Sequence, residues 1–139
     1  MLLAPRVGDR AIVRVQSSVR FVALRSRPQP DLALLKPRRD YYREQGPAAD
    51  DILLLIEVMD SSAEYDRETK APLYARAGVS EVWLVDILAG LLEVHREPTS
   101  TGYRSVRIVR GAEALAPQAL PDLVMTLADI LGSSEPRAS

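Results

Sequence analysis

Apolar residues occur along this chain in short blocks that predict a mixture of strands and helices. The longest block, residues 52–59 (ILLLIEVM), has the length and continuity of a buried central strand. A block of this kind is covered on both faces, so we expect it at the middle of a sheet. Further strands are predicted at residues 11–16, 19–24, 31–35, 81–86, 91–96 and 103–109, the last two as a hairpin.

Two helices are predicted between and after these strands. A capping-box pattern, Ser61-x-x-Glu64, opens the first, and Gly78 is the natural residue to end it. Pro72 lies inside this segment, so it either kinks the helix or moves its start to a later residue. The second helix is short, residues 126–131, with Thr126 as its cap.

Length and composition place these elements in one domain. The 139 residues are enough for a single core, which we assign to residues 1–131, followed by a disordered tail at 132–139. Cysteine is absent, and neither a membrane span nor a signal peptide is recognisable, which favours a cytoplasmic protein with no membrane partner.

Charge is distributed unevenly, although the net charge of −1 predicts no general affinity for nucleic acid. Residues 1–50 contain ten basic and five acidic side chains, whereas the rest of the chain contains eight and fourteen. Arg38, Arg39 and Arg43 are interleaved with tyrosines in a polar loop, a pattern that suits contacts with phosphates and bases. A merely solvated loop explains the same pattern.

Glu57 is the residue of the central strand that most needs an explanation, because burying a carboxylate without a partner is costly. Asp31 lies at the entrance of another predicted strand, and Lys70 follows on the next helix. If the two strands pair, the two carboxylates converge at one sheet edge and suit Mg²⁺ or Mn²⁺. Strand alternation predicts Leu53, Leu55, Glu57 and Met59 on one face, and Ile52, Leu54, Ile56 and Val58 on the other.

At this point the residues resemble a known family. The pattern consists of Pro30-Asp31, Glu57-Val58, Asp66-x-x-x-Lys70 and the block YARAGVSEVWLVD at residues 74–86. It resembles the Uma family of putative restriction endonucleases, within the PD-(D/E)XK nuclease superfamily, over roughly residues 16–131. The resemblance implies an α+β, restriction-endonuclease-like fold, in which helices flank a mixed sheet, and a Mg²⁺-dependent nuclease.

The resemblance also implies roles for individual residues. Asp31 and Glu57 would hold the metal ion, with the Val58 carbonyl as a further ligand, and Lys70 would assist the attacking water. The superfamily usually has this lysine two residues after the second acid, where this chain has Met59. Family members usually also have an N-terminal helical segment that this sequence is expected to lack.

Purely structural roles are alternative interpretations of the same residues. Asp31 could shape the turn into its strand, and Lys70 could pair with Asp66 one helical turn earlier. Tyr74 could pack in the core or support the site with its hydroxyl, and Trp83 is expected in the core. His95 is expected to be exposed, because it shares a strand face with Glu93 and Glu97.

The leading hypothesis is therefore a Mg²⁺-dependent endonuclease domain that hydrolyses DNA, in which Arg38, Arg39 and Arg43 meet phosphates. One rival hypothesis is an inactive module that keeps the nuclease fold for binding nucleic acid or for assembly. Another is a purely structural domain whose apolar strands complete a homodimer.

Overall fold

The computed structural model describes residues 10–15, 32–39, 47–59 and 69–132 of the chain. Asp31, Arg43, Asp66, the strand predicted at residues 19–24 and the tail from residue 133 lie outside these ranges. The described elements are β1 (Ile12–Val15), β2 (Leu32–Leu35), the 3-10 helix η3 (Ala49–Asp51), β3 (Ile52–Met59), α3 (Ala71–Ala77), β4 (Glu81–Asp86), β5 (Leu91–Pro98), β6 (Tyr103–Arg110) and α4 (Leu127–Gly132).

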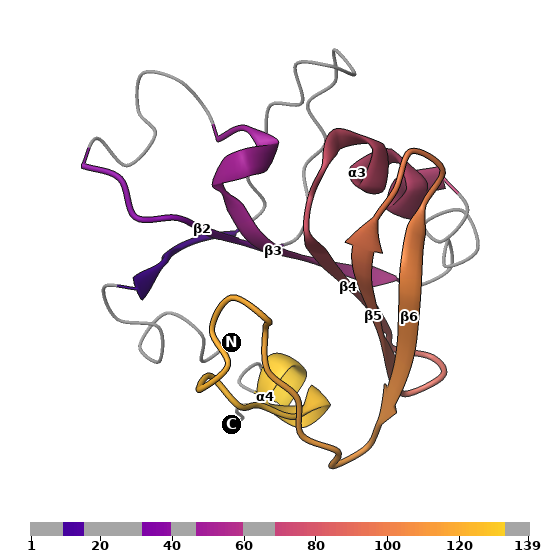
Figure 1. The fold of residues 1–139 in the computed structure, drawn as a ribbon. Helices are drawn as coiled ribbons and strands as arrows, with labels where there is room; N and C mark the ends of the chain where they lie inside the picture. The colour runs from indigo at the N-terminus through magenta and orange to yellow at the C-terminus, as the bar shows by residue number, and fades with distance from the viewer. Residues whose placement is uncertain (1–9, 16–31, 40–46, 60–68, 133–139) are drawn as a thin grey trace.

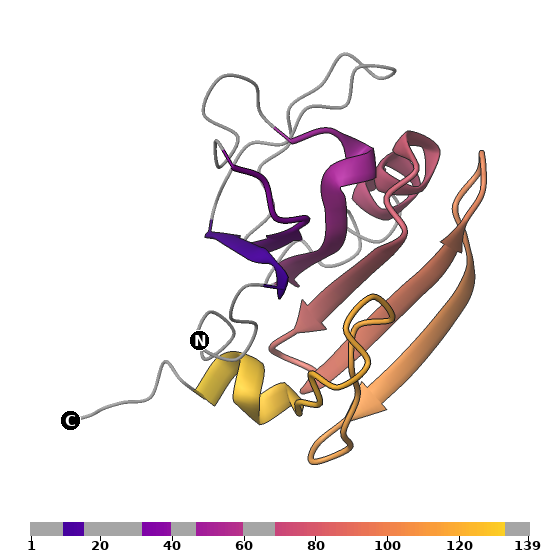
Figure 2. The same ribbon diagram turned by 60° about the vertical axis from the view of Figure 1, so that its left-hand side comes forward.

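The strands of the described ranges form one mixed, six-stranded sheet in the order β1 to β6. Each neighbouring pair is antiparallel except β3 and β4, which run parallel and are connected through a segment that contains α3. Figure 1 shows α3 and α4 on opposite sides of this sheet, and Figure 2 shows β4, β5 and β6 side by side with β6 at the edge. The fold is α+β, with helices flanking a mixed sheet, as predicted.

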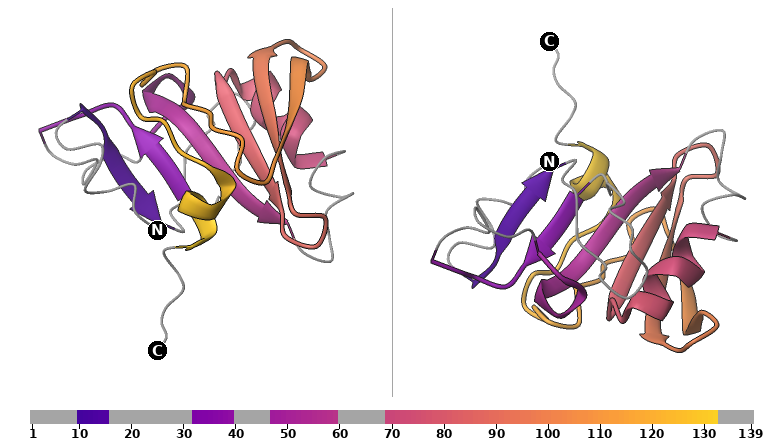
Figure 3. Two further views of the ribbon diagram at one scale, coloured as in Figure 1. Left: turned by 90° about the horizontal axis from the view of Figure 1, so that it is seen from below. Right: turned by 90° about the horizontal axis from the view of Figure 1, so that it is seen from above.

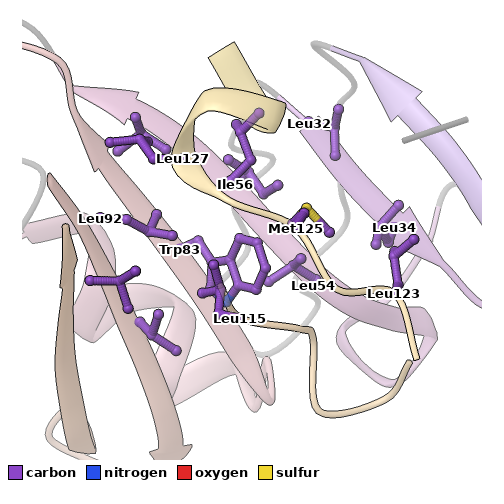
Figure 4. Packing of buried hydrophobic residues seen from close by; sticks show 14 of the residues in the cluster. Leu32, Leu34, Leu54, Ile56, Trp83, Leu92, Leu115, Leu123, Met125 and Leu127 are labelled. Atoms are coloured by element: carbon purple, nitrogen blue, oxygen red, sulfur yellow. The ribbon is translucent and has the colours of Figure 1, made fainter. Parts of the chain in front are cut away.

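One face of the sheet packs against α4 and the irregular chain that precedes it. Trp83 is fully buried at the centre of this layer, which confirms its predicted place in the core. The chain at residues 111–126 crosses this face and is tied down by a bridge between Leu115 and Met125 (Figure 4). This layer explains why β3 is apolar on the side that faces away from α3.

The opposite face packs against α3. Ala71, Tyr74 and Val79 from the helix and the chain just after it cover Leu55 and Leu84 of the central strands. Glu57 belongs to this same face, since it lies one alternation beyond Leu55. Both faces of β3 are therefore covered, as its continuous apolar sequence predicted.

The predicted alternation of β3 is wrong at its first two residues. Ile52 packs with the α3-side core and Leu53 packs against the opposite one. The register explains this, because Leu34 pairs with Leu54 whereas Leu35 pairs with Ile52, so that Leu53 is left over. A bulge of this kind reverses the side-chain alternation on one side of it.

The helices differ slightly from the predicted ones. The described α-helix begins at Ala71 with Pro72 in its first turn, which is the later start that the proline allowed. It ends at Gly78, whose φ of 92° is the left-handed conformation expected there. Gly132, predicted to begin the tail, instead ends α4. None of the described helices is long and apolar enough to cross a membrane.

Candidate active site

Glu57 lies two residues before the end of β3, on the face covered by α3, and only 3% of its surface is exposed. Leu84 pairs with it on the parallel neighbour β4, and Leu32 of β2 pairs with the adjacent residue Ile56. An acid at this position loses its hydration, so it requires hydrogen bonds or an opposite charge. The predicted burial of Glu57 is confirmed.

Two side chains that precede or belong to α3 meet this carboxylate. The Tyr74 hydroxyl donates a hydrogen bond to Glu57 Oε2, and Lys70 Nζ lies 3.5 Å from Glu57 Oε1. Lys70 and Tyr74 are four residues apart, and the backbone of Lys70 is already helical (φ −74°, ψ −42°). Their side chains therefore share one side of the helix and converge on the same strand.

The three groups differ in their access to solvent. The side chain of Lys70 is 33% exposed, whereas those of Glu57 and Tyr74 are buried. The ammonium group thus lies between the buried carboxylate and the solvent. An anionic substrate that approaches from outside meets this positive charge before it meets Glu57.

The oxygen atoms of Glu57 suit a hard divalent cation, which prefers carboxylate and carbonyl ligands. Each carboxylate oxygen has two lone pairs, so a bond from Tyr74 or Lys70 does not exhaust its capacity. Within the described ranges, however, no group of three or more His, Asp or Glu side chains could hold a metal ion. The part of the site that the structure describes supplies one carboxylate of the predicted pair, since Asp31 lies outside it.

The arginines of the described ranges lie away from this cluster. Arg38 follows β2 and lies 4.0 Å from Asp51, the residue immediately before β3. Asp51 precedes Glu57 by six residues, which is about 20 Å along an extended strand. Arg39 is exposed beside Arg38. The structure therefore places both arginines at the end of β3 opposite to Glu57.

His95 is buried, and the prediction that it is exposed is wrong. It shares a strand face with Glu93, as expected, and its Nε2 lies 3.0 Å from Glu93 Oε1. The ring of Tyr103 packs edge-on against it, with the ring centroids 5.7 Å apart. Sequence reasoning missed this pair because its burial depends on the covering by α3 and by Tyr103, which no local pattern reveals.

Tyr103 also contributes a hydrogen bond that connects β6 to the chain just after α3. Its hydroxyl donates to the carbonyl oxygen of Val79 at 2.6 Å, just beyond the end of α3. Burial raises the pKa of the Tyr103 hydroxyl above its ordinary value, and the negative charge of Glu81 raises it further. The hydroxyl therefore remains a neutral donor that anchors β6 to the chain after α3.

A second buried carboxylate, that of Glu81, connects three segments of the chain through hydrogen bonds. Glu81 is fully buried at the start of β4 and accepts hydrogen bonds from Trp83 Nε1, Arg96 Nε and the backbone N–H of Gln118, at 2.7 to 2.8 Å. Arg96 also donates to the carbonyl oxygen of Ala116. These bonds fasten the crossing chain at residues 111–126 to the sheet. The side chain of Arg96 is 30% exposed beside Glu81, as that of Lys70 is 33% exposed beside Glu57, so both buried carboxylates have a partly exposed cation next to them.

The comparisons with known proteins agree with this architecture. The sequence pattern of the family Uma2, "Putative restriction endonuclease", matches residues 2–128. A crystal structure from Anabaena variabilis ATCC 29413, titled as a putative nuclease belonging to DUF820, has a similar fold with a TM-score of 0.65 and 15% sequence identity. The similarity covers 89% of this chain and 69% of that one. No curated protein gave a significant match. The chain is a nuclease-like domain and belongs to the Uma2 family of putative restriction endonucleases.

Proposed function

We propose that this chain is an endonuclease domain that hydrolyses phosphodiester bonds of DNA and depends on Mg²⁺ or Mn²⁺. The observation that carries the proposal is the buried Glu57 carboxylate with the partly exposed Lys70 ammonium group in front of it. A carboxylate that can hold a metal ion and a cation that can stabilise charge on a phosphate are two of the protein groups that a metal-assisted phosphodiester hydrolysis uses. Membership of the Uma2 family supports the same reaction class.

In this proposal, Asp31, Glu57 and the Val58 carbonyl hold the metal ion. Asp31 and Glu57 are the chain neighbours of Leu32 and Ile56, which pair with each other across β2 and β3. When bound, the ion supplies Lewis-acid polarisation of a phosphate oxygen and lowers the pKa of a coordinated water. In the overall reaction, a water oxygen bonds to phosphorus, one P–O ester bond breaks, and the departing oxygen takes a proton.

Lys70 has two tasks. Its ammonium group orients the attacking water and stabilises the negative charge that builds up on the phosphate. It also lies 3.5 Å from Glu57 Oε1, and this pairing offsets part of the cost of burying the carboxylate. Tyr74 holds Glu57 in place by donating to Oε2. The supporting role predicted for Asp66 is kept in this proposal, although Asp66 lies outside the described residues.

Arg38, Arg39 and Arg43 are proposed to bind backbone phosphates away from the bond that is cut. Arg38 lies by Asp51, about 20 Å along β3 from Glu57, a span of several nucleotides. Contacts of this kind fix the register of a duplex and carry no sequence information. The cytoplasmic location and the homodimer stay predictions.

The deciding experiment measures cleavage of supercoiled plasmid DNA in Mg²⁺ or Mn²⁺. Glu57→Gln keeps the shape and a hydrogen-bond acceptor for Tyr74 but removes the charge, and we expect at least a ~100-fold loss of rate. Glu113→Gln is the matched control, since Glu113 is an exposed acid paired with Arg107, and its rate should equal that of the wild type. Equal cleavage by wild type and Glu57→Gln would refute the catalytic assignment.

Lys70→Met tests the role of the ammonium group. It keeps most of the aliphatic stem and removes the charge, so cleavage should fall. Stability should fall as well, because the buried Glu57 carboxylate loses its cationic partner, and circular dichroism melting checks that the variant is folded under the assay conditions. Lys70→Arg keeps the charge and should retain part of the rate. Identical rates for Lys70→Met and the wild type would remove Lys70 from the mechanism.

A second candidate function is a nucleic-acid-binding or assembly module that keeps the fold without turnover. The specific observation in its favour is that Glu57 has a hydrogen-bond donor and a cation of the protein itself as partners, in Tyr74 and Lys70. Titration calorimetry with Mn²⁺ distinguishes the two functions. No metal binding, together with salt-sensitive binding of DNA, would favour the module.

A further inference from the structure

Two large aliphatic side chains lie in the turn that connects β4 to β5, residues Ile87–Gly90. Leu88 is 81% exposed and Ile87 is 49% exposed. A single exposed aliphatic residue is ordinary on a protein surface. Two in succession at the tip of a turn indicate a contact surface when the turn has a fixed conformation and lies beside a candidate active site. The Ile87–Gly90 turn has both properties.

The turn is held in one conformation. The buried Asp86 accepts a hydrogen bond from the backbone N–H of Ala89 at 3.0 Å through Oδ1, and from that of Gly90 at 2.9 Å through its carbonyl. Gly90 has a φ of 67°, which other residues adopt only with strain. A preorganised turn loses little conformational freedom when it binds a partner.

The turn also lies at the end of the sheet where Glu57 is found. Met59, two residues after Glu57, pairs with Asp86, and the backbone N–H of Ile87 lies 3.5 Å from the carbonyl oxygen of Met59. Figure 3 shows the C-terminal end of β3 beside this turn in both views. A duplex bound across Glu57 therefore passes the turn.

A positive charge accompanies the aliphatic side chains. Arg110 ends β6, is exposed, and pairs with Leu91, the residue directly after the turn. Proteins that deform DNA combine this chemistry, because an aliphatic wedge enters a base step while arginines contact the adjacent phosphates. Aliphatic and arginine side chains also occur together in protein interfaces, so it is the position of the turn beside Glu57 that favours DNA.

We propose that the Ile87–Gly90 turn is a duplex-DNA contact, in which Leu88 is wedged into a base step and Arg110 binds a neighbouring phosphate. The inference rests on the proposed endonuclease function and specifies how the substrate is deformed near Glu57. Unstacking costs least at pyrimidine–purine steps, so the turn favours cleavage close to such steps.

The test is binding of a duplex oligonucleotide that carries 2-aminopurine, measured in EDTA so that no cleavage occurs. Wild type should raise the 2-aminopurine fluorescence, which reports an unstacked base. Leu88→Ser should abolish this rise and weaken binding about tenfold, the effect of removing one buried aliphatic side chain. Arg110→Ala should lower the slope of log affinity against log salt by about one.

Val124→Ser is the matched control, since Val124 is 48% exposed and lies in the chain that crosses the opposite face of the sheet. Its affinity and fluorescence should equal those of the wild type, and circular dichroism melting checks the fold of each variant. Equal signals for Leu88→Ser and wild type, or equal losses for Leu88→Ser and Val124→Ser, would overturn the inference.

Three further outcomes have separate meanings. If wild type cuts plasmid DNA but Leu88→Ser behaves like it in every assay, the inference fails and the endonuclease function stands. If wild type neither cuts nor binds DNA, both fail. A dimer of wild type that Leu88→Ser converts to monomer, without a change in DNA affinity, would assign the turn to a second copy of this chain and overturn the inference.

Discussion

The hydroxyl of Tyr74 donates a hydrogen bond to the buried carboxylate of Glu57, which precedes it by seventeen residues. This bond connects α3 to the central strand β3 through the candidate active site. Because Lys70 reaches the same carboxylate from the residue immediately before α3, the position of this helix sets the position of both groups. The site and the packing of the helix are therefore coupled.

Tyr74→Phe should destabilise the protein by about 1–3 kcal/mol, the cost of leaving a buried charged acceptor without its donor. Tyr103→Phe is the matched control, because it removes a tyrosine hydroxyl that donates to the neutral carbonyl of Val79. Tyr103→Phe should lower the free energy of unfolding by less, about 0.5–1.5 kcal/mol. Urea unfolding followed by circular dichroism measures both. An equal cost for the two variants would show that the charge of Glu57 adds nothing to the bond.

Gly78→Ala tests how α3 is terminated. Gly78 has a φ of 92°, and a Cβ atom added there would have no neighbour within 4 Å, so the cost is conformational strain alone. We expect a loss of about 1–2 kcal/mol in stability. Gly78→Asn should lose less, because asparagine adopts the left-handed conformation more readily than alanine. If alanine and asparagine are equally tolerated in thermal melts, the backbone conformation of Gly78 is not required.

The elements that the sequence predicts well are those whose pattern is local. Residues 52–59 and 81–86 form strands as predicted, because a continuous apolar run with β-branched residues fits a covered strand. The end of α3 at Gly78 and the cap at Thr126, which accepts from the N–H of Asp129, are equally local signals.

What the sequence does not predict depends on partners distant in the chain. The faces of Ile52 and Leu53 are reversed by a bulge that is defined only against β2. His95 is buried by α3 and Tyr103, neither of which its own strand reveals. Within the site, the burial of Glu57 and the role of α3 could be predicted, whereas the hydrogen bond from Tyr74 was one of two open alternatives.

Glu81→Ala should be among the most destabilising substitutions in the chain. It leaves the buried indole N–H of Trp83 and the part-buried donors of Arg96 and Gln118 without their acceptor, and the loss of three hydrogen bonds to a charged group should cost about 3–5 kcal/mol. Glu81→Gln keeps an acceptor and should cost less, so it remains measurable if Glu81→Ala does not fold. The exposed pair of Glu113 with Arg107 provides the control, and Glu113→Ala should cost below ~1 kcal/mol.

Urea unfolding at neutral pH measures the differences in the free energy of unfolding between the wild type and the Glu81 and Glu113 variants. The chain at residues 111–126 is the part that Glu81 fastens to the sheet, through Gln118 directly and through Arg96 to Ala116. Its amide hydrogens should therefore exchange faster in Glu81→Gln than in the wild type. Unchanged exchange in this segment would show that the buried carboxylate does not hold it.

The stability of the protein should fall at high pH through Tyr103. Burial and the charge of Glu81 raise the pKa of its hydroxyl in the folded state, whereas in the unfolded chain it titrates near 10. The folded state thus keeps a proton that the unfolded state releases, and stability is full below pH ~10 and falls above it. The slope of the free energy of unfolding against pH that this one group contributes is about 1.4 kcal/mol per pH unit.

Urea unfolding of wild type and Tyr103→Phe from pH 8 to 11 measures this slope, because the other titrating groups are common to both proteins. The difference in the free energy of unfolding between wild type and Tyr103→Phe should become smaller as the pH rises above 10. A difference that does not change with pH would contradict the raised pKa of Tyr103.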